Sequence, residues 1–62
     1  MFENVGTYLQ ILSEEKDISI DLLKEVVESV MILALKKKYG DNVNFHINFD
    51  NNNNPTVYRG VN

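Results

Sequence analysis

The chain has 62 residues, no cysteine and a net charge of −3. A chain this short forms at most one domain with a small core, and neither a disulfide framework nor a cysteine-ligated metal can support that core. Residues 1–35 have seven carboxylates against two lysines (−5), whereas residues 36–62 have four cations against two carboxylates (+2), so the acidic first half disfavours non-specific binding to nucleic acid.

The first predicted element is a helix over residues 2–16. Apolar side chains recur there with helical spacing, at Phe2, Val5, Leu9 and Leu12. Gly6 weakens the first turns by about 1 kcal/mol relative to alanine, which moves the expected start of the helix towards Thr7.

The second predicted element is a helix over residues 20–39, the longest periodic segment. Ser19 is a good N-cap and Gly40 a good stop. Acidic residues gather near the N-terminus and lysines near the C-terminus, as the helix dipole favours. One half of the helical wheel is apolar, formed by Ile20, Leu22, Leu23, Val26, Val27, Val30, Met31, Leu33 and Ala34.

Two apolar residues of this helix, Ile32 and Leu35, fall on its polar side. Either another element of the fold covers them, or they form an exposed apolar contact for a partner. We favour cover by the same fold, because a helix that crosses a sheet is often buried on more than one side.

Two strands are predicted after Gly40, over residues 43–49 and 56–61, because apolar residues alternate with polar ones from Val43 to Phe49. The asparagine run 51–54 between them is expected to be a mobile loop tip under no packing demand. The fold class is therefore α+β, two helices followed by a β-hairpin (α-α-β-β), in one domain over residues 1–62. An isolated hairpin is marginal in water, so the sheet is expected to be incomplete. Either another copy supplies strands or, as we favour, the natural protein continues.

The sequence predicts no catalytic residues, no metal site and no cofactor. His46 is the single histidine and lies on the polar face of its strand, so it has no second ligand of the usual kind beside it. Asp41 and Asp50 suit turn positions better than a carboxylate pair. Nothing approaches the length of a membrane span or the pattern of a signal peptide, and a cytoplasmic location is expected.

The best candidate contact is Lys36-Lys37-Lys38-Tyr39 at the end of the second helix. The lysines either only solvate the helix end and complement its dipole, or bind phosphate or an acidic protein with Tyr39 packing beside them. Arg59 joins this patch if the hairpin folds back over the end of the helix.

Three segments follow one another along the chain, SEEKDIS (13–19), EVVES (25–29) and ALKKKYG (34–40). In the order and spacing of these segments the chain resembles the start of bacterial NusA-type transcription factors. The second helix departs from the family pattern by carrying valines and Met31 where the family has alanines, and the asparagine run carries no family signature.

This resemblance implies the first half of an N-terminal domain that docks on RNA polymerase near the β-subunit flap and the RNA exit channel. It implies roles in elongation, pausing, termination and antitermination, with nascent RNA bound mainly by S1 and KH domains outside these 62 residues. The lysine end would then lie near exiting RNA.

Two other functions stay open on the residues alone. One is a self-associating interaction module, a homodimer held by strand pairing at the open sheet edge or by the apolar faces around Phe45 and Phe49. The other is a small RNA-contacting module that uses Lys36–Lys38 and Arg59, against which the acidic first half argues.

Overall fold

The computed structural model describes residues 4–60. Its elements in chain order are α1 (Val5–Lys16), α2 (Ile20–Tyr39), β1 (Phe45–Phe49) and β2 (Pro55–Arg59). The predicted α+β class and the order of two helices followed by an antiparallel hairpin are confirmed. Positions 2, 3 and 61 of the predicted elements lie outside the described residues.

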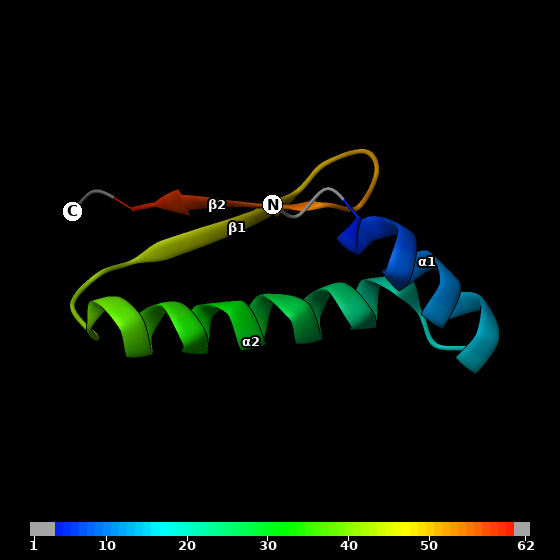
Figure 1. The fold of residues 1–62 in the computed structure, drawn as a ribbon, viewed down its shortest axis with the longest axis horizontal. Coiled ribbons are helices and arrows are strands. Elements are labelled where there is room, and N and C mark those ends of the chain that lie inside the picture. The colour runs from blue at the N-terminus through cyan, green and yellow to red at the C-terminus, as the bar shows by residue number, and fades with distance from the viewer. Residues whose placement is uncertain (1–3, 61–62) are drawn as a thin grey trace.

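The molecule is elongated, 38 × 18 × 18 Å. Figure 1 shows the hairpin running along one side of α2, with α1 beside the first turns of α2, at the opposite end of the molecule from the last residues of α2. The loop between the strands lies beside the start of α1. Segments far apart in the sequence, the first helix and the hairpin loop, therefore meet at one end of the fold.

Helix α1 begins at Val5, before the start near Thr7 that Gly6 suggested. Asn4 makes no side-chain capping bond; the Gly6 N–H instead donates to Oδ1 of Asn54 in the hairpin loop, at 2.7 Å. The missing local cap is thus supplied from 48 residues away. This tertiary bond compensates for the weak helix propensity of glycine.

Helix α2 has the ends that its sequence predicts. The hydroxyl of Ser19 accepts from the N–H of Asp21 at 3.2 Å, and the N–H of Gly40 donates to the carbonyl of Lys36 at 2.8 Å. Gly40 has a φ of 97°, a conformation that side chains with a Cβ rarely adopt. The caps explain why the helix stops where the lysines end.

The two strands pair antiparallel, with Phe45 opposite Arg59, Ile47 opposite Val57 and Phe49 opposite Pro55. These pairs share the face that packs on α2, where Ile47 and Pro55 are buried. The strands are shorter than predicted at Val43, and β2 starts one residue early. Proline is tolerated there because both strands of a two-stranded sheet are edges.

The side of α2 that packs inward does not coincide with the apolar half of its helical wheel. The half-buried side includes Val27 and Met31, as expected, but also Ile32 and Leu35. The apolar residues that face solvent instead are Leu22, Val26, Val30 and Leu33, between 51% and 69% exposed. These four residues belong to the apolar half of the wheel, so the two-stranded sheet covers only part of that half. Among the described residues only Leu9 and Ile47 are buried large apolar side chains.

Candidate docking site

The lysine end of α2, residues Lys36 to Tyr39, contacts the start of β1 through the ring of Tyr39. The Nζ of Lys38 lies 5.3 Å from the centre of the Tyr39 ring, within the range of a cation–π contact. The Tyr39 ring in turn lies 5.6 Å from the Phe45 ring, at an interplanar angle of 47°. Tyr39 is thereby held between Lys38 and the sheet while remaining half exposed.

Arg59 is brought to the same end of the molecule. It is the register partner of Phe45, the residue whose ring packs on Tyr39, and β2 ends beside the C-terminal end of α2 (Figure 1). Lys36, Lys37, Lys38 and Arg59 are all exposed and lie on elements that finish at the same end of the molecule. That they form one patch stays a prediction.

An apolar groove lies next to these cations. Its volume is about 440 Å³, and it is lined by Val30, Met31, Ala34, Leu35, Lys38, Tyr39 and Val57. The groove lies between the last turns of α2 and β2. Most of its lining residues are apolar, and Lys38 and Tyr39 line it as well. We call it the α2–β2 groove.

Ile32 and Leu35 have different surroundings in the structure. Both are half-buried, which agrees with cover by the same fold. Leu35 lines the α2–β2 groove, whereas Ile32 does not. Leu35 is therefore the member of the pair that lies where a partner could touch it.

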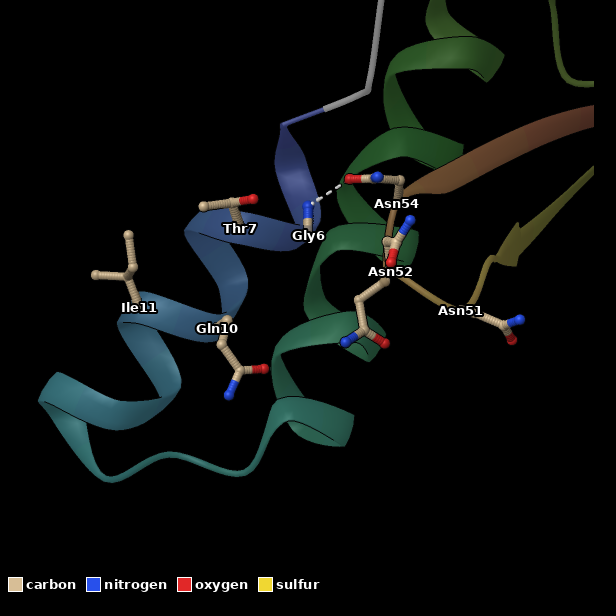
Figure 2. A pocket seen from close by; sticks show the side chains of 8 residues that line it. Gly6, Thr7, Gln10, Ile11, Asn51, Asn52 and Asn54 are labelled. Carbon is tan, nitrogen blue, oxygen red and sulfur yellow. Dashed lines mark hydrogen bonds between the residues drawn. The ribbon is translucent and has the colours of Figure 1, made fainter.

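A second cavity, of about 480 Å³, lies between α1 and the asparagine loop (Figure 2). The residues that line it are Gly6, Thr7, Gln10, Ile11 and Asn51 to Asn54. None of them carries a charge, so this cavity lacks the charged contacts that the lysine end offers.

The expectation of a loop under no packing demand is wrong. Oδ1 of Asp50 accepts from the backbone N–H groups of Asn52 and Asn54, at 2.8 and 2.9 Å, which fixes the turn from inside. Asn53 adopts a left-handed φ of 63°, as asparagine tolerates. Lys24 on α2 reaches Oδ1 of Asn53 at 3.5 Å. The loop thus ties the hairpin to both helices, a role that local composition cannot reveal.

The arrangement is suited to binding. Among residues 4–60, no group of three histidine, aspartate or glutamate side chains could hold a metal ion. No helix of that region is long and apolar enough to cross a membrane. Exposed cations, a half-exposed aromatic ring and an apolar groove together can hold an acidic protein segment that carries an apolar anchor.

Comparison with protein families gives a match to the NusA N-terminal domain over residues 5–60. The match includes both helices, both strands and the whole lysine end. Comparison with curated proteins and with solved structures gives no significant match.

Proposed function

Since this chain belongs to the NusA N-terminal domain family, whose domains bind RNA polymerase in transcription elongation and termination, we propose that it docks on the polymerase through its lysine end. Domains of this family are non-catalytic parts of transcription factors. The proposed contact consists of Lys36–Lys38, Tyr39 and Arg59 together with the α2–β2 groove.

This proposal rests on one observation: the cationic end of α2 and the apolar α2–β2 groove adjoin each other. Lys38 and Tyr39 line the α2–β2 groove and also belong to the cationic end. An apolar anchor of the partner would fill the groove, and acidic groups beside it would meet the lysines. Anchors in pockets supply most of the affinity of an interface, and surrounding charges set its orientation and its rate of formation.

The position of this contact on the polymerase and its regulatory effects are also proposals. We place the partner surface at the β-subunit flap near the RNA exit channel, in the bacterial cytoplasm, with effects on pausing, termination and antitermination. The positive end would then lie close to the emerging transcript without being its main binding site, because the chain as a whole is acidic.

The test is binding of the purified chain to core RNA polymerase, measured for the wild type, for Lys37→Glu and for Lys16→Glu. Both lysines are exposed and each lies in the last turn of its helix, so the two variants change net charge and helix end equally. We expect Lys37→Glu to weaken binding about tenfold, more at low salt than at high salt, and Lys16→Glu to leave it unchanged.

Equal loss in both variants would show that net charge, and not the lysine end, determines binding. A second variant, Ala34→Phe, fills the α2–β2 groove from an exposed position without changing charge. Wild-type affinity in this variant would remove the groove from the contact. Addition of single-stranded RNA in place of polymerase tests the RNA-contacting alternative, for which we expect weak binding that disappears at physiological salt.

A further inference from the structure

One face of α2 is apolar and exposed. It carries Leu22, Val26, Val30 and Leu33, at spacings of four, four and three residues, and their side chains are 51%, 54%, 59% and 69% exposed. We call these four residues the outer stripe. Such spacing keeps side chains in one row along a helix, as in helices that pair with another helix.

The outer stripe forms a large part of the apolar surface that the fold exposes. Four of the nine large apolar or tyrosine side chains that are exposed within residues 4–60 belong to it. Exposed apolar side chains gathered in one patch mark a surface that another molecule covers.

The charges along α2 select the partner and its direction. Its first half carries Asp21, Glu25 and Glu28 against Lys24, whose Nζ lies 3.7 Å from Oδ1 of Asp21, and its last turn carries Lys36, Lys37 and Lys38. A second α2 laid antiparallel on the first brings each acidic half to the other copy's lysines and opposes the two helix dipoles. A parallel arrangement would place like charges together.

The outer stripe is also self-complementary about its own midpoint. In an antiparallel pair centred between positions 27 and 28, Leu22 of one copy faces Leu33 of the other, and Val26 faces Val30. This is the geometry of a two-fold symmetric contact, in which one patch meets its own copy.

We propose that two copies of this chain associate through the outer stripes of their α2 helices, packed antiparallel. The contact shares only Val30 with the α2–β2 groove, and it does not depend on the proposed docking to polymerase. It differs from a dimer through the faces of Phe45 and Phe49, because those two residues are half-buried on the side of β1 that packs on α2. Strand pairing at the open sheet edge stays a separate prediction.

Sedimentation equilibrium over a range of concentrations tests the association. We expect the wild type to pass from monomer to dimer, and Leu33→Lys to raise the dissociation constant at least about tenfold. The matched control is Tyr58→Lys, which introduces the same charge at a similarly exposed side chain on the hairpin's outer face and should dimerise like the wild type. A wild type that stays monomeric, or a Leu33→Lys variant that dimerises normally, overturns the proposal.

The direction of packing is tested by single cysteines, which the cysteine-free sequence makes unambiguous. Ser29→Cys lies near the midpoint of the stripe, so the two copies of this residue approach within the ~7 Å that a disulfide requires. Lys37→Cys lies far from the midpoint, and its copies meet only in a parallel pair. We expect a cross-linked dimer with Ser29→Cys and none with Lys37→Cys under mild oxidation. The reverse result would overturn the antiparallel arrangement.

Discussion

At the scale of the residue, Gly6 decides how closely the hairpin loop approaches α1. Gly6 is buried, its N–H donates to Asn54, and a Cβ added to it would lie 1.8 Å from the carbonyl oxygen of Asn52 and 2.9 Å from that carbonyl's carbon. Backbone atoms of a fixed turn cannot move aside as a flexible side chain can. The glycine that weakens α1 locally is therefore the residue that permits its main tertiary contact.

Replacement of Gly6 by alanine should consequently destabilise the protein, although alanine is the better helix former by about 1 kcal/mol. We expect a net loss of about 1–3 kcal/mol in the free energy of unfolding, because the loop must shift and the capping bond from Asn54 lengthens. Thermal unfolding followed by circular dichroism measures it. Thr7→Ala, at the exposed neighbour, is the control and should not destabilise. A more stable Gly6→Ala variant would contradict the close approach.

At the scale of the element, the rotation of α2 determines which apolar residues stabilise the fold and which are free for partners. The side that packs on the hairpin includes Lys24, whose Nζ lies 5.6 Å from the centre of the Phe49 ring and 3.7 Å from Oδ1 of Asp21. A lysine lies on this side because its stem packs on the apolar hairpin while its charged end reaches polar partners. The outer stripe lies outside this packed side, and only its Val30 borders the α2–β2 groove.

Replacement by alanine should therefore lower the free energy of unfolding by different amounts at two leucines of α2. Leu35 is half-buried against the hairpin and Leu33 is 69% exposed. We expect Leu35→Ala to cost roughly 1–2 kcal/mol of unfolding free energy, about half the usual cost for a fully buried leucine, and Leu33→Ala to cost much less. Chemical denaturation at low protein concentration, where the chain is monomeric, measures both. Equal costs would show that α2 is rotated differently.

At the scale of the whole molecule, the fold has a small core for its length. Only Leu9 and Ile47 are buried large apolar side chains within residues 4–60, and nine large apolar or tyrosine side chains in that range are exposed. A core of this size supplies only a few kcal/mol. Any contact that covers exposed apolar surface, whether polymerase or a second copy, should therefore add a large fraction of the total stability.

The stability of the isolated chain should for this reason depend on its own concentration. Only folded chains associate into the dimer. Mass action therefore raises the urea concentration at the midpoint of unfolding as the protein concentration rises. We expect this increase in the wild type and in Tyr58→Lys, and a constant midpoint in Leu33→Lys. A wild-type midpoint that does not change with concentration would contradict folding stabilised by self-association.

Much of the fold and part of the site could be predicted from sequence because they depend on local chemistry. Ser19 and Gly40 set the ends of α2 through bonds within a few residues, and alternation of apolar residues is enough to indicate β1. The lysine patch was visible as a run of like charge. The family resemblance rested on the order of such local segments, and the match over residues 5–60 confirms it.

Only the tertiary structure decided the features that depend on distant pairs. The asparagine loop caps the start of α1 through the hydrogen bond from the N–H of Gly6 to Asn54. These two residues are 48 positions apart in the sequence. The rotation of α2 followed from the width of the hairpin, which covers one part of a broad apolar surface and leaves the outer stripe exposed. Local sequence determines which surfaces of an element are apolar, but which of them is buried depends on the shape of what packs there.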